Sequence, residues 1–209
     1  MPSKASSSPR LWLRLVPPPS PDEGWLGALV GEALASEHPL DVSTQPALWG
    51  GAMRGCDAVL IAGGGVEVLG ATSRDHAADL LHAHLIQVLS SIGREHLDVL
   101  CLPISRPLPE HAVLGALSGA RAAQTEGLVG SLALTGPDPD VAATLLSTNR
   151  DLEFALVRPE DVSHFESMER LVVMDAADPG PWLRRGARAL VAVSSPEGVR
   201  RLASEVAHT

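Results

Sequence analysis

The clearest indication of the fold is SRDHAADLLHAHLIQVLSSIGREHLDVLCLPI (73–104). Its first part, 73–96, opens with Ser73 and Asp75, which are helix-start signals, and predicts a long helix. Its second part, 97–104, is a short apolar run typical of a strand that is buried on both faces. Because the apolar run DAVLIAG (57–63) lies upstream, the segment as a whole predicts one parallel strand–helix–strand unit.

The same alternation continues in both directions along the chain. Further apolar runs lie at 10–16, 40–44, 129–136, 152–159, 170–176 and 189–195, and helix-like stretches lie at 24–38, 110–127, 138–149, 180–188 and 196–208. About eight strands that alternate with helices predict an α/β fold, a (β/α)8 barrel of the TIM type. The connection EDVSHFESME (160–169) is too short and polar for a standard helix, which leaves room for a short barrel that lacks one helix.

An open, doubly wound sheet is the alternative architecture. The Gly63–Gly65 cluster lacks the GxGxxG spacing of a dinucleotide-binding turn, and a P-loop needs a lysine that this chain has only at Lys4. The closed barrel is therefore preferred. We expect residues 1–9 to form a flexible tail and residues 10–209 to form a single barrel domain.

Composition narrows the class of partner. The net charge is −9 and the basic residues form no long cluster, which argues against nucleic acid. The apolar stretch 11–16 is short and interrupted by Arg14, so it predicts neither a signal peptide nor a membrane span. Cys56 and Cys101 are too few for a disulfide framework, and they favour a cytoplasmic location.

Three stretches resemble the aldo-keto reductases. In 76–104 a long helix ends with Leu89-Ser90 and Gly93, and Asp98 precedes the next apolar run, as before that family's fourth strand. The passage from the helix at 110–127 into GSLALTG (130–136) and the final AVSSPEGVRRLASEV (192–206) are also similar to family segments. The resemblance covers roughly residues 40–207 in the order of elements, and it implies the barrel fold and a nicotinamide cofactor.

The residues that carry that family's chemistry are missing. The resemblance implies a Tyr proton donor held by an Asp, a Lys and a His, but this chain has no Tyr at all. Asp41 fills the Asp place, whereas Pro46, the Gly63–Gly65 turn and Pro103 stand at the Tyr, Lys and His places. Asp41 is therefore the only possible catalytic remnant, and it cannot by itself protonate a carbonyl oxygen.

The cofactor site implied by the resemblance is also eroded. Ser194, Ser195 and the helix that follows them could still bind an anion through free backbone N–H groups, and Arg200 or Arg201 could supply the lost positive charge. We expect no cofactor to bind, and NADP at these residues is the alternative.

Two functional hypotheses follow. The first is an aldo-keto reductase-like pseudoenzyme that binds a protein partner or a small-molecule ligand, with no nucleic acid or membrane partner. The second is an oxidoreductase or another enzyme of changed chemistry at the barrel mouth, using Asp175, His164 and Arg158, where Arg106, Glu160 and Asp161 also follow strand ends. A helix carries His76, Asp79, His82 and His84, for which a solvated outer face is preferred over a metal site. We place Trp49 in a loop near the barrel mouth.

Overall fold

The computed structural model describes residues 10–20, 22–64, 66–104, 108–136, 138–175 and 178–206. The tail expected over 1–9 lies outside these ranges. Eight parallel strands close into a barrel in chain order, with β1 paired to both β2 and β8. The strands are β1 (Leu11–Leu15), β2 (Leu40–Asp41), β3 (Leu60–Gly63), β4 (Leu97–Pro103), β5 (Val129–Thr135), β6 (Leu152–Val157), β7 (Leu171–Met174) and β8 (Arg188–Val193). The predicted TIM-type fold is confirmed, and the open sheet is excluded.

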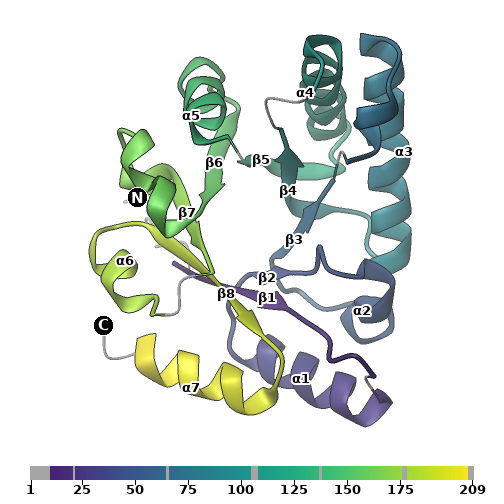
Figure 1. Cartoon of the computed structure of the whole chain (residues 1–209). Helices are drawn as coiled ribbons and strands as arrows, with labels where there is room; N and C mark the ends of the chain where they lie inside the picture. Colours follow the sequence, from purple (N-terminus) through teal and green to yellow (C-terminus); the bar gives the residue numbers. More distant parts are fainter. Residues whose placement is uncertain are drawn as a thin grey trace, which may run out of the picture.

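Helices surround the barrel (Figure 1). They are α1 (Glu23–Ala35), α2 (Pro46–Met53), α3 (Arg74–Ile92), α4 (Glu110–Thr125), α5 (Pro139–Thr148), α6 (Gly180–Arg184) and α7 (Pro196–Val206). The helix-start signals act as expected: the Ser73 hydroxyl accepts from the His76 N–H, and Asp138 caps α5. None of the helices within the described ranges is long and apolar enough to cross a membrane.

The connection between β6 and β7 differs from a regular strand–helix repeat, and the connection between β2 and β3 differs from the sequence expectation. Between β6 and β7, where every residue is described, the chain forms two 3-10 helices, η2 (Pro159–His164) and η3 (Met168–Arg170), in place of an α-helix. Between β2 and β3 it forms α2, although the sequence analysis placed Trp49 in a loop. That placement is wrong: Trp49 is completely buried inside α2, and its Nε1 donates to the Thr44 carbonyl at 2.7 Å. Gln45, a left-handed residue, precedes the helix without a side-chain cap, and the start signal that remains is Pro46 in the first turn.

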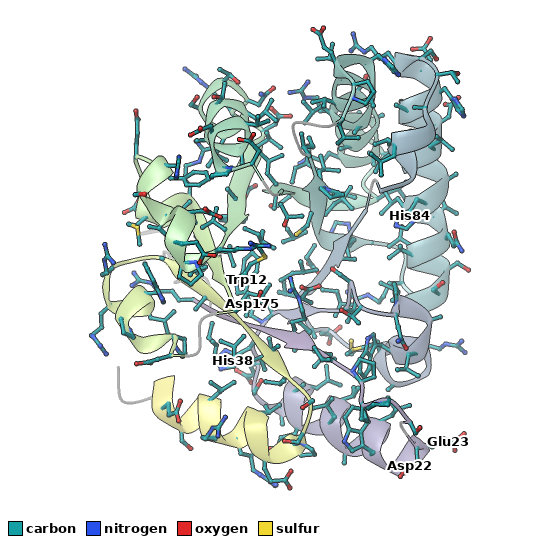
Figure 2. All side chains as sticks on the ribbon, viewed as in Figure 1. Trp12, Asp22, Glu23, His38, His84 and Asp175 are labelled. Atoms are coloured by element: carbon teal, nitrogen blue, oxygen red, sulfur yellow. The ribbon has the colours of Figure 1, made fainter. Side chains whose placement is uncertain are left out.

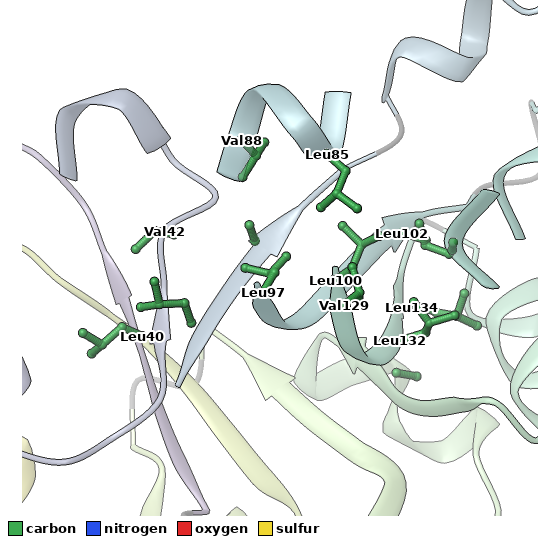
Figure 3. Close-up of a cluster of buried hydrophobic side chains, with 14 of the residues drawn as sticks. Leu40, Val42, Leu85, Val88, Leu97, Leu100, Leu102, Val129, Leu132 and Leu134 are labelled. Atoms are coloured by element: carbon green, nitrogen blue, oxygen red, sulfur yellow. The ribbon is translucent and has the colours of Figure 1, made fainter. Parts of the chain in front are cut away.

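The apolar core has two parts because successive strand side chains point to opposite faces. One part lies between the strands and the helices, where Leu85 of α3 points toward Leu100 and Leu102 of β4 (Figure 3). The other fills the barrel itself, with members Trp12, Ile61, Val99, Cys101, Ala133, Leu156, Val172 and Leu190. Trp12 meets Phe154 edge to face at 5.6 Å, and Arg188 stacks over Phe154 at 4.4 Å. The barrel interior is therefore a packed core, and ligand access is limited to its rim.

Candidate functional site

The carboxyl ends of β1 and β2 bring two opposite charges together at the mouth of the barrel. Arg14 lies two residues beyond Trp12 on the same inward face of β1, and the strand register pairs it with Asp41, the last residue of β2. The Arg14 Nε donates to Asp41 Oδ2 at 2.7 Å. Asp41 is only 1% exposed, and within the described ranges no other charged residue is buried.

Both carboxylate oxygens of Asp41 are engaged. Oδ1 accepts from the backbone N–H of Ser43 at 2.9 Å and from the Ser43 hydroxyl at 2.5 Å. The Ser43 hydroxyl in turn accepts from the Gly63 N–H at 2.6 Å, which ties the turn after β2 to the end of β3. Charge pairing and three donors compensate the burial of this carboxylate, so Asp41 is held in place as an acceptor.

A second carboxylate lies at the rim, near a terminal nitrogen of Arg14. Asp175 follows β7 (Figure 2), and its Oδ1 lies 3.9 Å from the Arg14 NH1. Its side chain is 66% exposed, and its backbone has a φ of 54°, which is unusual for a residue other than glycine. Met174, the preceding residue, places its Sδ 3.8 Å from the Arg14 NH2.

Cys101 belongs to the packed wall of the barrel below this pair. Its side chain is 3% exposed, and burial together with the negative charge of Asp41 raises the pKa of the thiol, while Arg14 lowers it to a smaller extent. The thiol therefore stays protonated at neutral pH and is a poor nucleophile.

The other predicted mouth residues do not gather around Asp41 and Arg14. His164 ends η2, and its Nδ1 lies 2.7 Å from Asp140 Oδ1 at the start of α5. Arg158 is exposed beside η2, which contains Glu160 and Asp161, and Arg106 lies outside the described residues. Of the proposed trio, the structure brings only Asp175 to the Arg14–Asp41 pair.

The residues expected to hold a cofactor phosphate fall in two places. Ser194, Ser195 and Arg201 line a cavity of about 430 Å³ between the end of β8 and α7. Ser195 already caps α7 by accepting from the Gly198 N–H at 3.1 Å. Arg200 does not line this cavity, because it points to Glu32 at 3.5 Å and Glu197 at 3.0 Å.

His76 and His82 of α3 have separate partners. His76 contacts the Thr72 backbone N–H and hydroxyl, His82 approaches Glu126 at 3.7 Å, and His84 lies further along the helix (Figure 2). Across the described ranges, no group of three or more His, Cys, Asp or Glu side chains is placed to hold a metal ion.

Sequence reasoning missed Arg14 and Ser43. Arg14 was noted only because it interrupts an apolar run, although a lone charge at an inward position of a buried strand calls for a buried partner. Its partner Asp41 was identified independently from the family resemblance. The sequence does not show the strand register that places Arg14 and Asp41 side by side.

Solved structures share this architecture. A candidate aldo-keto reductase from Pseudomonas aeruginosa has a TM-score of 0.67 at 18% identity, over 95% of this chain and 88% of its own. An aldo-keto reductase from Bacillus halodurans, in its holo form, has a TM-score of 0.67 at 13% identity, over 90% and 83% of the two chains. An aldose reductase from Schistosoma japonicum has a TM-score of 0.65 at 14% identity, over 91% and 81%.

Sequence comparison adds nothing to this likeness, since no family model and no curated protein sequence matches the chain. The identities are low, so the structural match concerns the path of the backbone and leaves the chemistry to the residues of this chain. The resemblance to the aldo-keto reductases is confirmed in that sense: the chain has the barrel fold of those enzymes.

Proposed function

We propose that this chain uses an aldo-keto reductase barrel to bind a protein partner or a small-molecule ligand, and that it does not reduce carbonyl groups. The observation that carries the proposal is the state of Asp41. Asp41 is the one carboxylate that could remain from a catalytic site. It is 1% exposed, and both of its oxygens accept hydrogen bonds from Arg14 and Ser43. At the barrel mouth, Asp41 therefore acts as a structural acceptor of hydrogen bonds.

The available proton donors support the same conclusion. Reduction of a carbonyl by a nicotinamide requires a hydride and, at the oxygen, a proton from a positioned acid. The chain has no Tyr. A guanidinium such as that of Arg14 does not release its proton, the Ser43 hydroxyl points to Asp41, and the Cys101 thiol is buried with a raised pKa.

Consumption of NADPH and NADH tests this proposal. We expect no oxidation above the rate without protein when the purified chain is offered an aldehyde, a ketone and a quinone, with a competent aldo-keto reductase as the positive control. Turnover that disappears in Asp41→Ala would overturn the proposal, because the carboxylate would then support a reaction. The folded state of Asp41→Ala is checked by circular dichroism.

Retained binding of NADP without turnover is a second candidate, favoured by the cavity that Ser194, Ser195 and Arg201 line. Titration with NADPH, followed by cofactor fluorescence, tests it. Arg201→Gln should weaken any binding by about tenfold, since it removes a charged contact to phosphate. Arg200→Gln is the matched control, because Arg200 points to Glu32 and Glu197. Equal effects of the two changes, or no saturation, would reject this site.

An enzyme of changed chemistry at the mouth has less support. It needs His164 and Arg158 to converge with Asp175, whereas His164 pairs with Asp140 at the start of α5. A cytoplasmic location is part of the main proposal, because Cys56 and Cys101 are both free thiols.

A further inference from the structure

Arg14 has hydrogen-bonding capacity that its contacts with the described residues do not use. A guanidinium carries five N–H donors, and four of them belong to the two terminal nitrogens. The Nε of Arg14 is satisfied by Asp41 at 2.7 Å. Among the described residues, its terminal nitrogens meet the Met174 thioether at 3.8 Å and Asp175 at 3.9 Å and no other acceptor. The thioether is a weak acceptor, and the second distance is too long for a hydrogen bond.

The Arg14 side chain can be reached from solvent. The Arg14 side chain is 24% exposed. Its partner in register on β8 is Ala192, a small residue that is itself exposed and that lines the cavity between β8 and α7. Asp41 holds the other edge of the guanidinium in place, so the free donors are presented with little conformational freedom left to lose.

Asp175 occupies the approach to these donors only loosely. Its side chain is 66% exposed, its contact with the Arg14 NH1 is long, and its backbone adopts the left-handed region at a φ of 54°. A non-glycine residue in that region carries strain that is common at ligand sites. The carboxylate of Asp175 thus stands where the carboxylate of a ligand could bind. Its single long contact lacks the geometry of a bidentate pair with the guanidinium.

We infer that Arg14 anchors a binding site for small organic carboxylates at the mouth of the barrel, in competition with the side chain of Asp175. This inference deepens the proposed binding role and rests on it. A ligand carboxylate can accept two parallel N–H bonds from a guanidinium, which a single contact at 3.9 Å does not provide. Because Asp41 and Asp175 already place two negative charges here, a monoanion fits the site better than a phosphate dianion.

Calorimetric titration with benzoate tests the site, with benzamide as the neutral probe of the same shape. We expect saturable binding of benzoate and none of benzamide. Asp175→Asn should tighten benzoate binding roughly three- to tenfold, since it removes the competing charge. Arg14→Lys keeps a cation beside Asp41 but removes the planar fork, and it should weaken binding by about tenfold. Asp79→Asn, at an exposed aspartate of α3, is the control for net charge, because it also removes one negative charge.

Three results would overturn the inference. They are no saturable binding of benzoate by Asp175→Asn up to tens of millimolar, equal binding of benzamide, and unchanged binding in Arg14→Lys. Inorganic phosphate that binds more tightly than benzoate would also count against a carboxylate site. The titration contains no cofactor, so it is separate from the test of the proposed function. Carbonyl turnover would reject that function alone, whereas absent benzoate binding would reject only the assignment of this site.

Discussion

Arg14 and Asp41 join the first two strands of the barrel through a 2.7 Å ion pair on its inward side. The resemblance to the aldo-keto reductases implies a Lys at the end of the third strand, where this chain has the Gly63–Gly65 sequence. The cation beside Asp41 is instead Arg14 of β1. With Gly63 donating its N–H to Ser43, the end of β3 still supports the carboxylate, but only through the backbone.

Replacing Asp41 should cost far more stability than its single charge suggests. In Asp41→Asn, the guanidinium of Arg14 loses its charge partner in a mostly buried position, and we expect the free energy of unfolding to fall by about 2–4 kcal/mol. Urea denaturation monitored by circular dichroism measures this change. The double variant Arg14→Met with Asp41→Leu should recover much of the loss, because it leaves no unpaired charge.

The surface pair of Arg121 and Asp151 is the matched control. Its atoms are as close, with the Arg121 Nε 2.5 Å from Asp151 Oδ2, but both side chains are substantially exposed. The hydrogen bond from Arg121 lowers the pKa of Asp151, so its contribution is present near neutral pH and is lost as the pH falls through that lowered pKa. Asp151→Asn should cost less than about 1 kcal/mol. Equal losses for Asp41→Asn and Asp151→Asn would contradict the buried role of Asp41.

The two cysteines should differ sharply in reactivity. Cys101 is inside the barrel and its thiol pKa is raised, whereas Cys56 is half-buried near the surface beside Arg94, whose NH1 donates to the Cys56 carbonyl. At mildly alkaline pH, we expect one thiol of the native chain to react with a chromogenic disulfide reagent, and both to react after unfolding in urea. The variant Cys56→Ser should show almost no reaction when native. Rapid modification of Cys101 in that variant would mean that the barrel opens far more readily than its packing implies.

The fold could be predicted from the sequence because it depends on local patterns. Buried parallel strands require apolar runs such as 97–104, and these runs alternate with helical stretches, several of which begin at a capping residue such as Ser73 or Asp138. The polar connection at 160–169 correctly indicated that no α-helix joins β6 to β7. By contrast, α2 was missed because PALWGGAM contains two glycines and follows a residue without a capping side chain.

The site could be predicted only in part, because it depends on strand register and on the direction of side chains. Asp41 could be singled out by its place in a family-like order of elements. Arg14 lies opposite Asp41 because β1 pairs with β2, and no local sequence pattern indicates that pairing. The same limit applies to Arg200 and Arg201, which are adjacent in sequence. Successive residues of an α-helix are rotated by about 100°, which directs the first toward Glu32 and the second toward the cavity beside β8.

His38 should make the chain less stable in mild acid. Burial lowers the pKa of this side chain from 6.5, so the folded state favours the neutral ring while the unfolded chain binds a proton more readily. Stability is then highest above pH 6.5, and it falls as the pH drops through 6.5 toward the lowered pKa. Urea midpoints between weakly alkaline and weakly acidic pH should decline less in His38→Gln. Because Glu37 and Asp57 line the same cavity, an unchanged decline in that variant would assign the effect to carboxylates instead.

Gly115 should be intolerant of even one added methyl group, because α4 packs against α3 at this residue. A Cβ placed there would lie 2.3 Å from the Arg74 carbonyl oxygen and 2.4 Å from the Ala77 Cβ, which are distances that require the two helices to separate. Gly115→Ala gains helix propensity of about 1 kcal/mol but should lose more through overpacking, with a net destabilisation of about 1–3 kcal/mol. Gly31→Ala in α1 is the control, since a Cβ there meets nothing within 4 Å, and it should stabilise the chain by about 0.5–1 kcal/mol. Opposite signs in urea denaturation would show that contact between α3 and α4, and not helix propensity, decides the residue at 115. Stabilisation by both changes would mean that the two helices pack less closely than these distances require.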